Sequence, residues 1–122
     1  FPIGLDDDAG AVYAHAAEVA GRLLDSVLAD PEPVFTPQAG EATYAPKIRP
    51  EDRQLDLSRP ADELVRVVRA LSPYIGARAE LEGRRVTVWR AQVGDDGRFE
   101  PLEVQPEGGS RMSADAWRRG LR

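Results

Sequence analysis

The stretch ATYAPKIRPEDRQLDLSRPADELVRVVRALSPYIGA, residues 42–77, decides how this chain folds. Its first part is kept extended and out of a central strand by Pro46 and Pro50, because proline cannot donate a backbone hydrogen bond to a sheet. Apolar side chains then recur at three- and four-residue spacing, at Leu64, Val67, Val68 and Leu71. This spacing predicts one strongly amphipathic helix. Pro73 and Gly76 follow it and are typical of a helix stop.

The residues before this stretch predict a second helix of a different kind. Asp6, Asp7 and Asp8 precede an apolar periodicity over residues 9–28. Aspartates at this place accept hydrogen bonds from the free N–H groups of a helix start and suit its dipole. The apolar face is mostly alanine and valine, so it suits packing against a larger partner surface rather than a core of its own.

A proline-rich segment separates this helix from the rest of the chain. Three prolines occur within residues 31–37, which forbids a continuing helix and favours an extended path. The expected organisation is a terminal helix, a linker and a main domain, at residues 1–30, 31–41 and 42–122.

The residues after the amphipathic helix predict a small antiparallel sheet. The expected elements are a hairpin, a third strand and a last helix, at residues 77–81 with 85–93, 99–105 and 114–119. Ser113 is in place to cap the last helix. The predicted fold class is therefore α+β, mostly β, with one packed helix.

Composition excludes several classes of function. The chain has 122 residues, no cysteine and one histidine, so a disulfide, a thiolate metal site and a histidine-rich metal site are all impossible. No apolar run approaches the ~18 residues of a membrane span. The phosphate-binding loop, the dinucleotide-binding glycine pattern and the nucleophile elbow do not occur. We interpret His15 as a packing or surface residue and expect no catalytic, cofactor-binding or metal-binding residue.

Charge is segregated along the chain, although the formal net charge is -5. Residues 1–46 hold one base against eight acids, a net charge of -7. Residues 47–90 hold ten bases against seven acids, a net charge of +3, and residues 91–122 hold five bases against six acids, a net charge of -1. Such segregation permits one basic face on an acidic molecule. An ordinary solvated surface is the alternative interpretation.

Cations on projecting elements are the candidate binding residues. They lie on the arm, the amphipathic helix and the hairpin, and the candidates for RNA contact are Lys47, Arg49, Arg66, Arg69, Arg84, Arg85 and Arg90. Arginine forks onto phosphates and stacks on bases. A few such contacts predict salt-sensitive, shape-based RNA binding without base-specific readout. Trp89 is interpreted as a core residue, with stacking on a base as the alternative.

The order of several short motifs resembles one family, the methionyl-tRNA formyltransferases. The linker and domain entrance are matched by Thr43-Tyr44-Ala45-Pro46-Lys47-Ile48, Glu51-Asp52, Asp56 and Arg69-Ala70-Leu71-x-Pro73-x-x-Gly76-Ala77. The resemblance continues in Val86-x-Val88-Trp89-Arg90-Ala91, Leu102-x-Val104-Gln105-Pro106-x-Gly108 and Met112-Ser113-Ala114-x-x-Trp117. The first helix, after Asp7-Asp8-Ala9-Gly10, resembles the last helix of that family's catalytic domain.

The resemblance implies a fold and a function. Members of this family are transferases of translation initiation and protein biosynthesis in the cytoplasm. They pass a formyl group from 10-formyltetrahydrofolate to the amino group of initiator methionyl-tRNA. The implied fold of residues 42–122 is a small OB-like β-barrel that contacts the acceptor arm and backbone of the tRNA. The family's catalytic and folate-binding motifs lie upstream of anything present here, so the implied partner is an N-terminal catalytic domain. Lys47 matches the family's linker lysine near the tRNA path.

The chain departs from the family at two places. Leu57 stands where the family commonly has tryptophan, and a four-residue turn replaces additional strands between Val93 and Gly97. Either the barrel is reduced, or the sequence omits a loop there. Two other functions stay open: a protein-interaction module that kept the fold without tRNA binding, and the same domain of a sugar-nucleotide formyltransferase.

Overall fold

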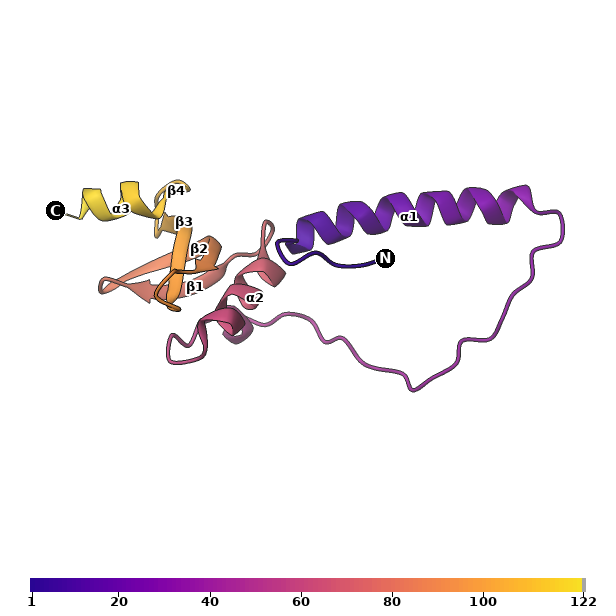
Figure 1. Cartoon of the computed structure of the whole chain (residues 1–122), viewed down its shortest axis with the longest axis horizontal. Helices are drawn as coiled ribbons and strands as arrows, with labels where there is room; N and C mark the ends of the chain where they lie inside the picture. Colours follow the sequence, from indigo (N-terminus) through magenta and orange to yellow (C-terminus); the bar gives the residue numbers. More distant parts are fainter. Residues whose placement is uncertain (122) are drawn as a thin grey trace.

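A long helix and a small α+β body make up this protein, seen in a computed structural model that describes residues 1–121 (Figure 1). In chain order the elements are α1 (Ala9–Ala29), the 3-10 turn η1 (Glu51–Arg53), α2 (Ala61–Leu71), β1 (Ala77–Leu81), β2 (Arg84–Val93), β3 (Phe99–Pro106), β4 (Met112–Ser113) and α3 (Ala114–Gly120). The hairpin, the third strand, both expected longer helices and the last helix are thus confirmed. Only β4 was not expected, because two residues carry no readable strand pattern.

The four strands form one antiparallel sheet in the order β1-β2-β3-β4. Glu82 and Gly83 join β1 to β2 with φ values of 52° and 69°, the positive pair that a tight hairpin turn requires. Between β2 and β3, the Gly97 N–H donates to the Gly94 carbonyl at 2.8 Å, and the Gly94 N–H donates to the Arg98 carbonyl at 2.8 Å. The connection between β2 and β3 is therefore a closed turn.

The core lies between α2 and the sheet. The buried α2 side chains are Leu64, Val68 and Leu71. They pack with Leu55, Ala77, Ala79, Val86, Val88, Val104, Ala114 and Trp117. Alternate residues of β1 and β2 face this core, as the period-two pattern of a half-buried strand dictates. The α+β class is confirmed: the sheet has four strands, with β1 and β4 at its edges, and α3 packs on the core besides the expected α2.

The turn between α2 and β1, residues 72–76, is held from four sides. The Ser72 hydroxyl donates to the Trp89 carbonyl at 2.7 Å. Arg53 donates to the Ile75 carbonyl at 2.7 Å and to the Gly76 carbonyl at 3.2 Å. Gly10 and Arg111 also donate to carbonyls of this turn. A single turn thus ties η1, α1, β2 and the segment before β4 to the body.

The segment before α2 is fixed by a local carboxylate. The Ser58 hydroxyl and the Ser58 N–H donate to Asp56 Oδ1 at 2.6 and 3.1 Å. These two hydrogen bonds, with the nearby Arg59 charge, lower the pKa of the Asp56 carboxyl because they stabilise its ionised form.

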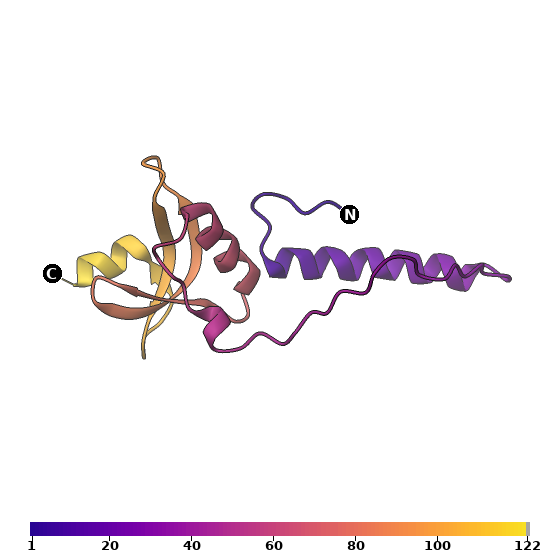
Figure 2. The ribbon, with the colours of Figure 1, turned by 90° about the horizontal axis from the view of Figure 1, so that it is seen from below.

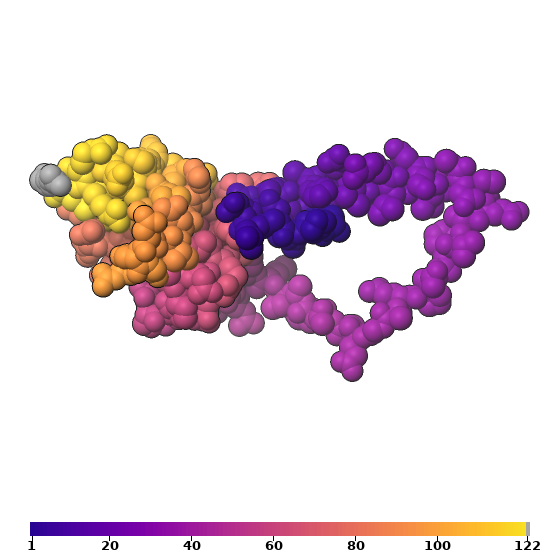
Figure 3. Space-filling model, in the orientation of Figure 1, coloured from indigo at the N-terminus to yellow at the C-terminus, as the bar shows by residue number. Residues whose placement is uncertain are grey.

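Helix α1 projects from the body and has no buried residue. Its N-cap is Asp8, whose Oδ1 accepts from the Ala11 N–H at 2.8 Å. The expected aspartate cap is thus confirmed. Both ribbon views show α1 leaving the body on the side opposite α3 (Figures 1 and 2). Residues 30–50, which include the linker and the arm, run back to the body as an exposed segment without strands. Open space separates this segment from α1 (Figure 3).

We predict that Gly76→Ala destabilises the body more than Gly83→Ala does. Both glycines have positive φ, +77° and +69°, so alanine costs about 1 kcal/mol or more in backbone strain at each. A Cβ at Gly83 meets open space, whereas a Cβ at Gly76 overlaps Thr87 and lies 3.0 Å from the Trp89 ring. Urea unfolding of both variants checks this; equal losses in the free energy of unfolding would contradict the packing described for Gly76.

Candidate nucleic-acid interface

The arm before η1 presents the first two candidate cations. Lys47 and Arg49 are both exposed. The Arg49 N–H donates to Asp52 Oδ2 at 2.7 Å, which fixes the end of the arm. The Arg49 guanidinium lies 3.9 Å from Glu51 Oε1, with about 70% of each side chain exposed (72% and 68%). Such an exposed pair is weak and leaves the guanidinium available.

The hairpin presents the next two candidates at the start of β2. Arg84 and Arg85 follow the Gly83 turn and are exposed. Arg85 Nη2 lies 3.3 Å from Glu107 Oε2 across the sheet, and Arg84 has no ion pair within residues 1–121. Since the Arg85–Glu107 pair is also largely exposed, a phosphate can compete for Arg85 at little cost.

The remaining candidates lie on α2 and the far part of β2. Arg66 is paired with Asp62 one helical turn earlier, at 2.7 Å. Arg69 is half-buried and, with Arg90, lines a cavity of about 350 Å³ beside α2. Neither Arg69 nor Arg90 makes an ion pair in the part of the chain that the structure describes.

The structure therefore divides the candidate cations into separate groups. The arm holds one group and the hairpin a second, while Arg69 and Arg90 form a third. Arg90 follows Arg84 by six positions along β2, which is about 20 Å at 3.3 Å per residue. Spaced cations of this kind suit an extended polyanion better than a single small ligand.

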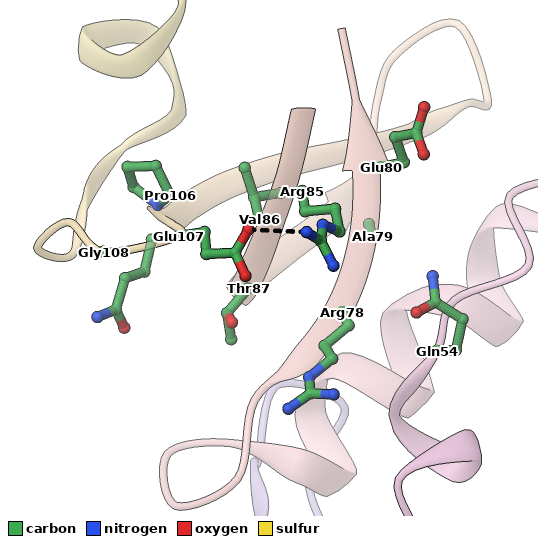
Figure 4. A pocket seen from close by; sticks show the side chains of 11 residues that line it. Gln54, Arg78, Ala79, Glu80, Arg85, Val86, Thr87, Pro106, Glu107 and Gly108 are labelled. Atoms are coloured by element: carbon green, nitrogen blue, oxygen red, sulfur yellow. Dashed lines mark ion pairs between the residues drawn. The ribbon is translucent and has the colours of Figure 1, made fainter. Parts of the chain in front are cut away.

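A polar groove on the outer face of the sheet adds one residue that the sequence analysis missed. It has a volume of about 480 Å³ and is lined from β1, β2, the end of β3 and Gln54. Arg78 lies in it, opposite Thr87, and Arg85 and Glu107 form their ion pair at its edge (Figure 4). The signal was the alternation of ARAEL over β1, which turns Arg78 outward. Glu80 also lines the groove, so the groove carries both positively and negatively charged side chains.

Trp89 packs against other residues of the body and is not an open stacking surface. Its ring lies under the Arg111 guanidinium, whose Cζ is 3.4 Å from the ring centroid. Its indole N–H donates to Gln105 Oε1 at 3.1 Å, and Arg111 Nη2 donates to the Pro73 carbonyl at 3.0 Å. Trp89 is half-buried rather than fully in the core. Arginine already covers one face of the ring, so base stacking on that face is excluded while this contact holds.

Other chemistry finds little support within residues 1–121. There, no three potential metal-ligating side chains come together. His15 stacks on Phe1 with ring centroids 4.2 Å apart, which agrees with a packing role. None of the helices in the described part is long and apolar enough to cross a membrane.

We predict that Arg111→Gln lowers the free energy of unfolding by roughly 0.5–1 kcal/mol, the usual size of an exposed cation–π contact. Arg111→Lys should recover only part of this, since an ammonium cannot both stack flat and reach the Pro73 carbonyl. Urea unfolding followed by circular dichroism measures both effects. Arg119→Gln, which removes an exposed arginine without a stacking partner, is the control; an equal loss there would contradict the Trp89 contact.

The chain is similar to known proteins over most of its length. Residues 47–101 match the family described as "Formyl transferase, C-terminal domain". A methionyl-tRNA formyltransferase of Ralstonia nicotianae is 39% identical over 120 residues, which cover 94% of this chain and 35% of that protein. The Leifsonia xyli subsp. xyli protein of that name is 39% identical, over 94% of this chain and 46% of its own. The Thermus thermophilus one is 36% identical, over 98% and 46%. The chain thus spans about a third to a half of the length of these curated relatives, and the resemblance expected from the sequence is confirmed.

Proposed function

We propose, on the premise that residues 47–101 are a formyl transferase C-terminal domain, that this chain is the C-terminal portion of a methionyl-tRNA formyltransferase and binds tRNA. The observation that carries the proposal is the similarity to such an enzyme over 94% of the chain. In this proposal the piece holds and orients initiator methionyl-tRNA by its acceptor arm and backbone. Formyl transfer from 10-formyltetrahydrofolate takes place on polypeptide outside this sequence.

The exposed cations support the tRNA part of the proposal. Lys47, Arg84 and Arg90 have no ion pair within residues 1–121, and the acids paired with Arg49 and Arg85 are themselves exposed. Cations of this kind exchange a carboxylate or water for a phosphate and release counterions from the RNA. Binding of this type positions a nucleic acid without reading its bases.

The apolar side chains of α1 support the domain organisation of the proposal. In its second half the large exposed side chains are Leu23, Leu24, Val27 and Leu28, with exposed fractions of 62%, 58%, 43% and 74%. A helix that leaves such a surface in water normally packs against another element. We propose that residues 1–30 are the last helix of a catalytic domain, residues 31–41 its linker and residues 42–122 the tRNA-binding domain.

A protein-interaction module is the second candidate function. The exposed aromatic and apolar side chains of the linker and arm favour it, notably Val34 at 90%, Phe35 at 79% and Tyr44 at 90% exposed. The net charge of -5 also works against a polyanionic partner. A co-purifying protein together with tRNA affinity no better than that of an acidic control protein would favour this candidate.

We predict salt-dependent binding of tRNA to this chain, and no formyl transfer by the chain alone. Lys47→Gln with Arg49→Gln should weaken binding at low salt by roughly a hundredfold, since each lost charge-assisted hydrogen bond is worth at least about 1.5 kcal/mol, or about tenfold in affinity. The double variant should also flatten the slope of log affinity against log salt by about one to two.

The matched control for this titration is Arg98→Gln with Arg119→Gln. It removes the same charge from two exposed sites outside the candidate set. Fluorescence anisotropy with labelled initiator tRNA measures all three proteins across a salt series. If the wild-type chain shows no tRNA binding at low ionic strength, the tRNA proposal is wrong. If both double variants lose the same affinity, the arm is not part of the proposed binding surface.

We predict that the amides of α1 after its first turn exchange rapidly with solvent in this chain. The reason is that no residue of α1 is buried, so local opening breaks few contacts. Hydrogen exchange with mass spectrometry, at several concentrations, measures this. Slow exchange that appears only with rising concentration shows self-association through the apolar side chains, which Leu24→Glu should abolish. Strong protection in a monomer would contradict the idea of a helix that lacks its partner.

A further inference from the structure

The cavity between α2 and β2 joins two candidate cations that are far apart in sequence. It is lined by Arg69 from α2 and Arg90 from β2, and Leu5, Asp6 and Asp8 reach it from the segment before α1. Its volume is about 350 Å³. The site is thus built from the body and from the residues that lead into the projecting helix.

Arg69 is unusual because its Nε is buried and has no hydrogen-bond acceptor within residues 1–121. A buried donor without an acceptor is destabilising, and more so when it is charged. The last turn of α2 explains why a cation sits here, since the helix dipole favours it. It does not explain an unused Nε–H. By contrast Arg66, one turn earlier, has its guanidinium on Asp62.

The nearby carboxylates do not neutralise the two arginines. Neither Asp6 nor Asp8 lies within 4.0 Å of a guanidinium nitrogen of Arg69 or Arg90 in the described residues. Asp8 is occupied as the cap of α1. Within residues 1–121 the cavity therefore holds two arginines that make no ion pair, and one of them, Arg69, has a buried Nε without a hydrogen-bond acceptor.

We propose that Arg69 and Arg90 together bind one oxyanion in this cavity, a phosphate of the RNA backbone, and that Asp6 opposes its entry. Phosphate oxygens accept from arginine N–H groups with short, charge-assisted bonds. The proposal rests on the tRNA partner proposed above and places one of its phosphates. A phosphate seated here lies next to the residues that lead into α1, so RNA binding and the placement of that lead-in are coupled.

The direct test follows the Arg Nε–H signals by ¹⁵N–¹H NMR while inorganic phosphate is added. The Arg69 signal should shift in a saturable way, whereas the Arg66 signal should stay in place. Arg90→Gln should weaken phosphate binding about tenfold, and because Arg90 is exposed this variant keeps the body folded. Equal shifts at Arg66 and Arg69, or none at Arg69, would overturn the site.

The second arm uses labelled initiator tRNA. Arg69→Gln and Arg90→Gln should each weaken its binding about five- to tenfold and reduce the salt slope by about one, and Arg66→Gln, on the same helix, is the matched control. Asp6→Asn should tighten binding two- to fivefold, since it removes a like charge beside the phosphate. Weaker binding by Asp6→Asn would contradict the opposing role of Asp6.

The outcomes separate this inference from the proposed function. If wild-type chain binds tRNA and the Arg69 and Arg90 variants bind it equally well, the site is wrong and the proposed function stands. If inorganic phosphate shifts Arg69 but does not compete with tRNA, the assignment to an RNA phosphate is wrong. If the wild-type chain binds no tRNA at all, the proposed function and the RNA assignment both fail.

Discussion

The turn at residues 72–76 is the constraint on which the rest of the structure depends. Its carbonyls accept from Gly10, Arg53 and Arg111, and the Ser72 hydroxyl reaches the backbone of β2. A turn that ends a helix leaves carbonyls without partners, and here donors from three distant parts of the chain supply them. The same bonds place the Arg111 guanidinium over the Trp89 ring. The turn therefore takes its hydrogen bonds only where these surrounding elements are in place.

Much of the fold could be predicted because its signals are local. The α2 stripe, the two hairpin runs and the caps Asp8 and Ser113 each depend on spacing within a few residues, and the structure bears them out. The sequence could not show which residues from distant segments come together. Arg69 and Arg90 line one cavity only because of how α2 lies across the sheet.

An acidic chain can still hold a polyanion when its charges are kept apart. The acids of the first third lie largely on α1 and the linker, away from the arm and hairpin cations. Exposed charges more than about 10 Å apart barely feel each other at ordinary salt. Net charge thus governs long-range approach, whereas contact depends on the local groups. The two charge regions meet at the cavity of Arg69 and Arg90, through Asp6 and Asp8.

The linker has a mechanical consequence. Helix α1, with 21 residues, is about 32 Å long at 1.5 Å per residue. Fully extended, residues 30–50 reach up to roughly 69 Å at 3.3 Å per residue. This is about twice the length of α1, along which they run back to the body. The tether is therefore slack, and it does not determine where the body sits relative to α1. That angle depends on a small joint, the Gly10–Ser72 hydrogen bond and the Tyr13–Tyr74 edge contact, which can swing open without stretching the chain.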